Sequence, residues 1–182
     1  MSLKEAASRP SPNVSRTKQS CNKISLPRGA GMGQAGSYWK GAAMVTDHVE
    51  TLIVGAGQAG LAMSHVLSRR GRPHLVLERG RLGERWRSER WDGLRFQFPN
   101  WSVRLPDFPF PCSEPDGFAT STEIVRFLEA YADLVRPPMR CGVAVTGLHR
   151  VEPDKGFRAQ TSTGLVSAGN VVIATGPSCG RG

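Results

Sequence analysis

The chain has 182 residues, which is enough for one globular domain and a tail. Its formal net charge is +9, but most of this excess lies in residues 1–46, which hold seven lysines and arginines and one acidic residue. We therefore expect that the rest of the chain does not bind nucleic acid. No apolar run approaches the ~18 residues of a membrane span, and the four cysteines lack the C-x-x-C spacing of zinc sites and redox dithiols, so we expect no membrane segment and no metal.

Residues 1–46 form a basic segment without hydrophobic periodicity, followed by a domain over residues 47–182. The segment is rich in Ser, Gly, Lys and Arg and has too little apolar surface to offset its ordering entropy, so we predict that it is disordered. It lacks the apolar core of a secretory signal and the clear amphipathic helix of a transit peptide. We favour Met44 as the natural start and expect a cytoplasmic protein with reduced thiols.

The stretch from Val49 to Gly80 has the order of parts that a phosphate-bearing cofactor requires. A short apolar run at residues 52–54 predicts a buried strand, and glycines follow it at the spacing G-x-G-x-x-G: Gly55, Gly57 and Gly60. In this motif the first glycine allows a tight turn, the second lets the backbone approach a pyrophosphate, and the third lets the helix pack close to the strand. The helix start, with Gln58 and Ala59, offers free N–H groups to the phosphates.

The remainder of this stretch completes a βαβ unit. A helix is predicted from Gln58 to Arg70 and ends at Gly71, and a second strand is predicted at residues 75–77. Glu78 lies 18 residues after Gly60, where a carboxylate can accept hydrogen bonds from a ribose. A glycine-rich turn without a ligand is the alternative, but the agreement of all five parts favours an adenine-dinucleotide site. The predicted buried stripe of the helix comprises Ala59, Ala62, Met63, Val66 and Leu67.

Residues 81–118 interrupt the βα pattern with a segment dense in Trp, Phe, Pro and Arg. Such residues either line a flat aromatic ligand or pin a long surface excursion to the core. Leu94 and Phe96 alternate with polar residues, as in a short strand. Thr120 and Glu123 then form a capping box before a helix of about four turns that ends at Pro137-Pro138. Its apolar positions are Ile124, Phe127, Leu128, Tyr131, Leu134 and Val135.

Four strands are predicted in the last part of the chain, at residues 141–145, 157–161, 165–168 and 170–176. The last is a continuous apolar run, typical of a central parallel strand. Its small residues Ala174 and Gly176 would let backbone approach a ligand at the carboxyl end of the sheet. The predicted fold is α/β, a parallel sheet with flanking helices and a small β meander.

Several of these segments together resemble the flavin-containing monooxygenase family and its bacterial FAD-dependent oxidoreductase relatives. The resemblance covers roughly residues 49–178. It rests on GAGQAG (55–60), Glu78, GERW (83–86), LPDFPFP (105–111), the helix after Thr120, and VVIATG (171–176).

The resemblance implies a Rossmann-like FAD-binding domain and assigns roles to individual residues. The glycine turn with Gln58 and Ala59 would hold the FAD pyrophosphate, and Glu78 the adenosine ribose. The further implied cofactor contacts are Arg79, Arg85, Trp86, Gln97 (toward the flavin ring), Val143 (adenine, through its backbone), Ala174, Thr175 and Gly176.

The resemblance also implies a reaction. NADPH reduces the flavin, O2 adds to form a peroxyflavin, and that species oxygenates a soft nucleophile or a ketone of a small-molecule substrate. The cofactor carries this chemistry, so no catalytic residue is assigned.

The sequence departs from the family in one respect, because a second G-x-G-x-x-G unit for NADPH and a segment completing the FAD domain are absent. We therefore expect an N-terminal FAD-binding part that needs a C-terminal half or a partner chain. The alternatives are a non-catalytic dinucleotide-binding remnant and an NAD-dependent dehydrogenase domain. A disulfide reductase would require paired redox cysteines after the second strand.

Overall fold

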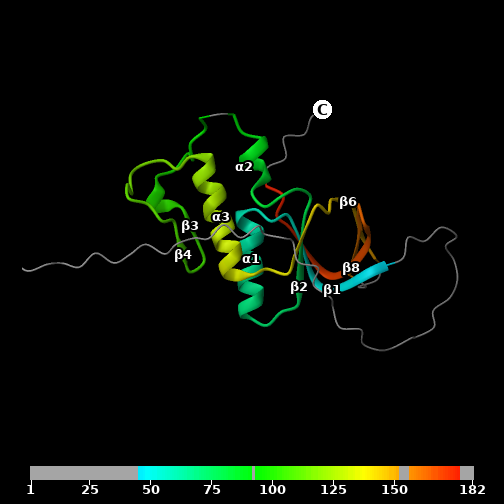
Figure 1. Cartoon of the computed structure of the whole chain (residues 1–182). Coiled ribbons are helices and arrows are strands. Elements are labelled where there is room, and N and C mark those ends of the chain that lie inside the picture. Colours follow the sequence, from blue (N-terminus) through cyan, green and yellow to red (C-terminus); the bar gives the residue numbers. More distant parts are fainter. Residues whose placement is uncertain (1–44, 92, 152–155, 177–182) are drawn as a thin grey trace, which may run out of the picture.

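The structure is a computed structural model that describes residues 45–91, 93–151 and 156–176. Its main feature is a six-stranded sheet with the strand order β5-β2-β1-β8-β7-β6 (Figure 1). β1 is parallel to both β2 and β8, and β2 is parallel to β5. β6, β7 and β8 are antiparallel neighbours and form the predicted meander. The strands are β1 (Val45–Val54), β2 (His74–Glu78), β5 (Met139–Cys141), β6 (Val145–Arg150), β7 (Phe157–Thr161) and β8 (Gly164–Ile173).

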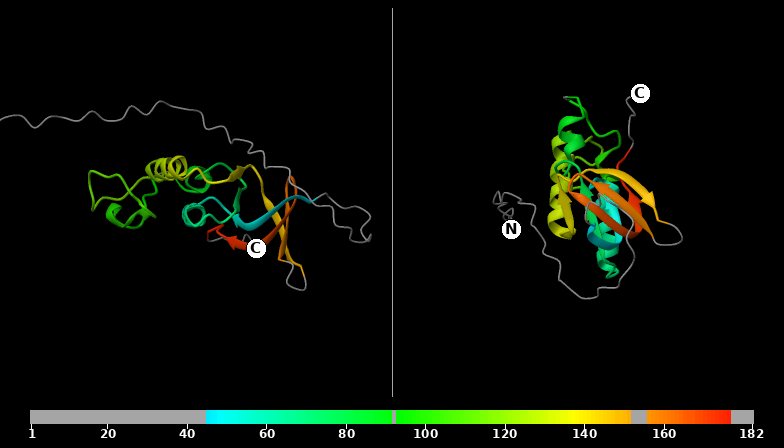
Figure 2. Two further views of the ribbon diagram at one scale, coloured as in Figure 1. Left: turned by 90° about the horizontal axis from the view of Figure 1, so that it is seen from below. Right: turned by 90° about the vertical axis from the view of Figure 1, so that its right-hand side faces the viewer.

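The helices and a small hairpin lie at the opposite end of the molecule from the antiparallel strands (Figures 1 and 2). α1 contacts both β1 and β2, and α3 packs against α1 and α2. The excursion between β2 and α3 contains α2, one turn of 3-10 helix and the two-stranded hairpin β3-β4. These elements are α1 (Gln58–Arg69), α2 (Glu84–Ser88), the 3-10 turn (Asn100–Ser102), β3 (Arg104–Leu105), β4 (Phe108–Pro109) and α3 (Ser121–Val135).

The central strands are buried on both faces, as the continuous apolar runs predict. Ile53 of β1 and Val76 of β2 pack with residues of α1 and α3 on one face. Leu52 and Leu75 face the opposite side, in a second cluster that includes Val166 of β8. Because neighbouring residues of a strand point to opposite faces, β1 and β2 connect the two clusters.

The carboxyl end of β8 differs from the prediction. The runs at 165–168 and 170–176 were predicted as separate strands, but they form one strand, Gly164–Ile173, and residues 174–176 leave the sheet. The separation is wrong because β8 keeps its parallel register with β1 from Ala168 through Asn170. β7 pairs only with residues 164–168 of β8. Within the part of the chain that the structure describes, residues 169–173 therefore pair with β1 alone. Ile173 is 69% exposed there.

Two other strand predictions are wrong. The strand predicted at residues 141–145 ends at Cys141, because Gly142 turns the backbone at φ +74°, and β6 begins only at Val145. The alternation of Leu94 and Phe96 does not make a strand either; only Arg95 forms an isolated bridge, to Thr120. The predicted disordered tail lies outside the described residues except at 45–46, where β1 already begins.

Both long helices occupy the predicted positions, but their buried faces differ in detail. In α1 the predicted stripe is confirmed at Ala62 and Leu67, which pack against the core, but it is wrong at Ala59, which is exposed, and at Met63, which is 36% exposed. The fully buried side chains are Leu61 and Ser64. Gly60 sets this orientation by placing its own side of the helix against the strand–helix turn. In α3 the capping box between Thr120 and Glu123 is confirmed. The predicted core residue at the end of α3, Leu134, is 60% exposed.

Candidate dinucleotide-binding site

The glycine turn lies between the carboxyl ends of β2 and β8. Gly55 adopts φ +105°, a conformation that L side chains rarely take, and its N–H donates to the Leu77 carbonyl at 2.8 Å. A Cβ added at Gly55 would lie 2.6 Å from the Ala174 carbonyl oxygen. This position therefore requires glycine for both conformation and space, and it brings Ala174 of the predicted site beside the turn.

The other two glycines of the motif have opposite surroundings. A Cβ added at Gly60 would lie 1.9 Å from the Gly55 carbonyl oxygen, so α1 can approach the turn only with glycine there. A Cβ added at Gly57 would meet no atom within 4 Å. Gly57 is the N-cap of α1 and makes no side-chain cap. The space in front of the α1 N-terminus is therefore open, as approach of a pyrophosphate requires.

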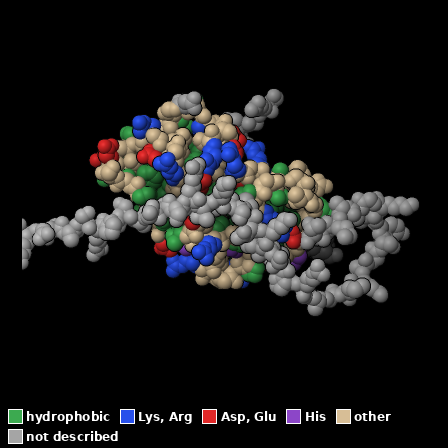
Figure 3. Space-filling view, viewed as in Figure 1, with side chains coloured by type: hydrophobic (Ala, Val, Ile, Leu, Met, Phe, Trp, Pro, Cys, Tyr) green, Lys and Arg blue, Asp and Glu red, His purple; other side chains and the backbone are tan. Residues whose placement is uncertain are grey.

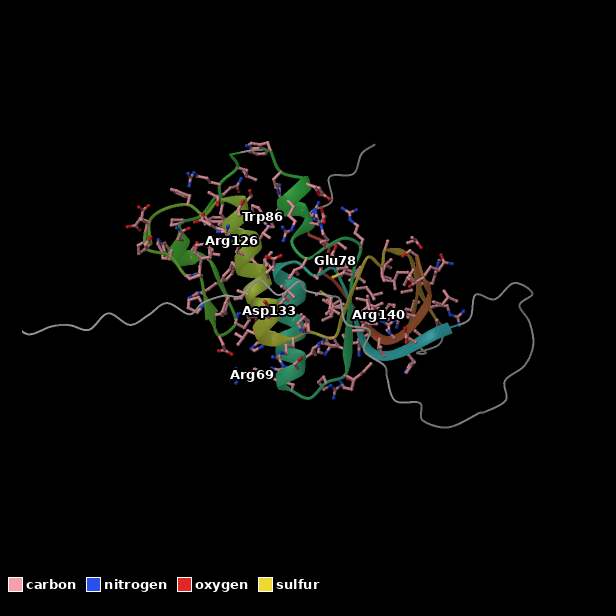
Figure 4. The ribbon with its side chains drawn as sticks, in the orientation of Figure 1. Arg69, Glu78, Trp86, Arg126, Asp133 and Arg140 are labelled. Carbon is pink, nitrogen blue, oxygen red and sulfur yellow. The ribbon has the colours of Figure 1, made fainter. Side chains whose placement is uncertain are left out.

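The Glu78 carboxylate lies directly against this turn. Its Oε2 accepts a hydrogen bond from the Ala56 N–H at 2.8 Å, and its Oε1 accepts one from the Gly80 N–H at 3.0 Å. Figure 4 shows Glu78 toward the upper end of α1, opposite the end that carries Arg69. Because a carboxylate has about four acceptor positions, both oxygens keep capacity for the hydroxyls of a ribose.

Replacing Glu78 by glutamine is expected to lower the free energy of unfolding by about 1–3 kcal/mol, because one of the two backbone N–H groups then faces an amide NH₂. Urea unfolding of the protein without ligand measures this change. Glu114→Gln is the matched control, since the Glu114 side chain is exposed. Equal unfolding midpoints for the two variants would mean that Glu78 does not anchor the turn.

Arg79, Arg85 and the residues after β8 surround the turn. Arg85 Nη1 donates to the Thr175 carbonyl at 2.9 Å, and a Cβ added at Gly176 would lie 2.9 Å from the same nitrogen. Arg85 Nε and Arg79 Nη2 each donate to one oxygen of Glu89. Figure 3 shows arginine side chains gathered over the region of α2. The structure thus brings five of the predicted site residues around the turn: Arg79, Arg85, Ala174, Thr175 and Gly176.

The aromatic and more distant site residues lie less close to the turn. Trp86 is half-buried. The centroid of its ring lies 5.9 Å from the ring centroid of Phe96 and 5.3 Å from the guanidinium carbon of Arg90. Gln97 is exposed on the excursion, and its position at a flavin ring stays a prediction. The Val143 N–H donates to the Glu78 carbonyl at 2.9 Å, so Val143 follows the site, but its contact with adenine also stays a prediction.

Sequence reasoning missed two groups that build this site. The Ala56 N–H anchors Glu78, and no side-chain pattern reveals a backbone donor of this kind. Glu89 was also missed, although its i,i+4 spacing from Arg85 is typical of a helical ion pair. In the described part of the chain no cluster of three or more His, Cys, Asp or Glu side chains is arranged to hold a metal. No helix among those residues is long and apolar enough to cross a membrane.

Comparison with known proteins assigns the chain to a family. Residues 52–177 match the model of the pyridine nucleotide-disulphide oxidoreductase family. The chain is 35% identical over 130 residues to an uncharacterized CzcO-like oxidoreductase of Geobacillus kaustophilus, covering 71% of the chain and 36% of that protein. It is 37% identical over 82 residues to the probable indole-3-pyruvate monooxygenase YUCCA3 of Arabidopsis thaliana, covering 44% of the chain and 18% of the relative. The chain therefore spans about a third or less of the length of these relatives.

A solved structure supports the same assignment. An oxidized steroid monooxygenase bound to NADP superimposes with a TM-score of 0.64 at 28% identity, over 71% of the chain and 26% of that protein. The family name refers to disulphides, but Cys112 and Cys141, the cysteines within the described ranges, form no disulfide bond. The fold is the Rossmann-like FAD-binding fold. The chain belongs to the pyridine nucleotide-disulphide oxidoreductase family, in the group of FAD-dependent oxidoreductases that includes the flavin monooxygenases.

Proposed function

We propose that this chain is the FAD-binding portion of an NADPH-dependent, monooxygenase-like oxidoreductase that acts on a small molecule. The observation that carries the proposal is the hydrogen bond of 2.8 Å from the Ala56 N–H to the Glu78 carboxylate. It holds a ribose-binding acid against a glycine turn whose second glycine, Gly57, faces open space. An adenosine diphosphate group needs both features at one place.

The residues around the turn suit the two ends of that group. The N-terminus of α1, with Gly57, Gln58 and Ala59, offers backbone N–H groups and the positive end of the helix dipole to the diphosphate. Glu78 offers acceptors to the ribose hydroxyls. When bound, FAD supplies hydride acceptance from NADPH and activation of O2, which no side chain provides. The protein's part is to bind and orient the cofactor, and we assign no side chain a proton-transfer role.

Arg79 and Arg85 add positive charge near the proposed diphosphate position. Arg79 follows Glu78 directly, and Arg85 binds the Thr175 carbonyl beside the turn. A pyrophosphate carries negative charge, and guanidinium groups bind phosphate oxygens through paired N–H donors. These cations favour a dinucleotide over a ligand without phosphate.

NADPH and the substrate are proposed to bind on a C-terminal half of the same polypeptide or on a partner chain. The share of its relatives that this chain spans, 36% of the Geobacillus oxidoreductase, supports this part of the proposal. The edge of β8 supports this part of the proposal too. Within the part of the chain that the structure describes, residues 169–173 pair with β1 alone, so their other edge offers backbone hydrogen-bonding groups to a further strand. Cys112 and Cys141 form no disulfide bond, which suits the reducing cytoplasm that we propose as the location.

Visible absorbance of the purified protein, recorded before and after addition of NADPH, tests the proposal. We expect flavin absorbance that NADPH bleaches. If the chain alone does not respond, the measurement is repeated with the C-terminal half or partner chain supplied. Flavin absorbance that NADPH does not bleach, either with the chain alone or with the second half supplied, would indicate a non-catalytic dinucleotide-binding remnant. A colourless protein that binds NAD and not FAD would replace the proposal with an NAD-dependent dehydrogenase domain.

A further inference from the structure

We infer that Glu89 is a positioning residue that orients Arg79 and Arg85 toward the diphosphate of a dinucleotide bound at the glycine turn. The inference rests on the proposed function, since it concerns the same site. Glu89 belongs to neither the glycine motif nor the strand-end acid, and nothing in the sequence pattern of the dinucleotide site requires it.

Glu89 uses each carboxylate oxygen for a different arginine. Its Oε1 accepts from Arg79 Nη2 at 2.6 Å, and its Oε2 accepts from Arg85 Nε at 2.8 Å. The hydrogen bond from Arg85, more than any other interaction, lowers the pKa of Glu89, so the carboxylate is ionised at neutral pH. One side chain at the end of α2 therefore fixes two cations that come from different segments.

The two arginines connect to the ends of the two strands that neighbour β1 in the sheet, β2 and β8. Arg79 is attached to the end of β2, where Glu78 and Gly80 are joined by a side-chain to backbone hydrogen bond. Arg85 reaches across to the Thr175 carbonyl beyond the end of β8. Glu89 closes a continuous set of hydrogen bonds from the end of β2, through α2, to the end of β8. At Thr175 this set meets the glycine turn, because a Cβ added at Gly55 would lie 3.2 Å from the Thr175 nitrogen.

The exposure of these groups separates positioning from stability. Arg79 is 68% exposed and Glu89 is 38% exposed, and exposed ion pairs contribute little to the free energy of folding. By contrast, an arginine held in one orientation has less entropy to lose when it binds a phosphate. Loss of Glu89 is therefore expected to affect ligand affinity more than stability.

The sign of the effect distinguishes positioning from simple charge. The three side chains together carry one net positive charge, and removing the carboxylate would leave two. By Coulomb's law alone this change would tighten the binding of an anionic ligand. A positioning role predicts the opposite, weaker binding.

Calorimetric titration with FAD and with ADP is the test, on the wild-type protein and on Glu89→Gln. We expect Glu89→Gln to weaken both ligands by about 3- to 10-fold, the range that one lost hydrogen bond produces. Glu84→Gln is the matched control, because Glu84 lies in the same helix and pairs with Arg81 instead. Its affinity for ADP should equal that of the wild type.

The same substitution in an Arg79→Ala, Arg85→Ala background shows whether Glu89 acts through the arginines. No further loss of ADP affinity is expected there, and an undiminished loss would overturn the inference. Equal or tighter binding by Glu89→Gln in the otherwise wild-type protein would overturn it as well, while leaving the proposed function intact. If the wild-type protein binds neither FAD nor ADP, the proposed function fails and the inference fails with it.

Discussion

Replacing Gly60 by alanine is expected to lower the free energy of unfolding by about 3 kcal/mol or more, the upper end of the cost of overpacking a closed interface. The added Cβ would lie 1.9 Å from the Gly55 carbonyl oxygen and 3.5 Å from the Ile53 side chain. The first neighbour is backbone of a turn that Leu77 and Ala174 hold on two sides, so it cannot move aside cheaply. Chemical unfolding followed by circular dichroism measures the change.

A variant at Gly57 serves as the comparison for Gly60→Ala. If Gly60→Ala unfolds at the same denaturant concentration as the wild type, α1 does not pack against the turn as closely as the structure describes. If the Gly60 and Gly57 variants lose stability equally, then Gly60 is not a closed position and Gly57 an open one, as the structure describes them.

Replacing Gly57 by threonine is expected to leave unfolding nearly unchanged and to weaken FAD binding by about 10- to 100-fold. The backbone of Gly57 lies at φ −76° and ψ −168°, which threonine adopts readily, and threonine caps a helix about as well as glycine does. No atom lies within 4 Å of the added Cβ, so the folded protein has room for it. The proposed diphosphate would occupy that room, and overfilling such a site costs about 1–3 kcal/mol.

Fluorescence titration with FAD measures the Gly57→Thr effect, with unfolding of the same sample as its control for folding. Unchanged FAD affinity would place the diphosphate elsewhere. Loss of affinity together with loss of stability would show that Gly57 supports the fold rather than the ligand.

The glycine turn and Glu78 were predictable from the sequence because their roles are local. The positive φ of Gly55 and the close contact at Gly60 are properties of one turn between one strand and one helix. The position of Glu78 follows from the parallel pairing of β1 and β2, which a βαβ unit imposes. The capping box at Thr120 was predictable for the same reason, since four consecutive residues define it.

Features that depend on partners distant in the sequence were not predictable. The predicted buried stripe of α1 included Ala59 and Met63 because they are apolar, but both are exposed, and Gly60 and Ser64 are buried instead. Ser64 can be buried because its Oγ makes a hydrogen bond of 2.7 Å with His74 Nε2, and that partner lies beyond the end of the helix. Likewise, the continuity of β8 depends on its register with β1, over a hundred residues earlier in the chain.

A crystal structure of the protein with FAD bound measures the central claim most directly. We predict that the diphosphate lies within hydrogen-bonding distance of the backbone N–H groups at the start of α1, and that the adenosine ribose hydroxyls contact the Glu78 carboxylate. FAD bound with its diphosphate away from Gly57, or with its ribose out of reach of Glu78, would contradict it.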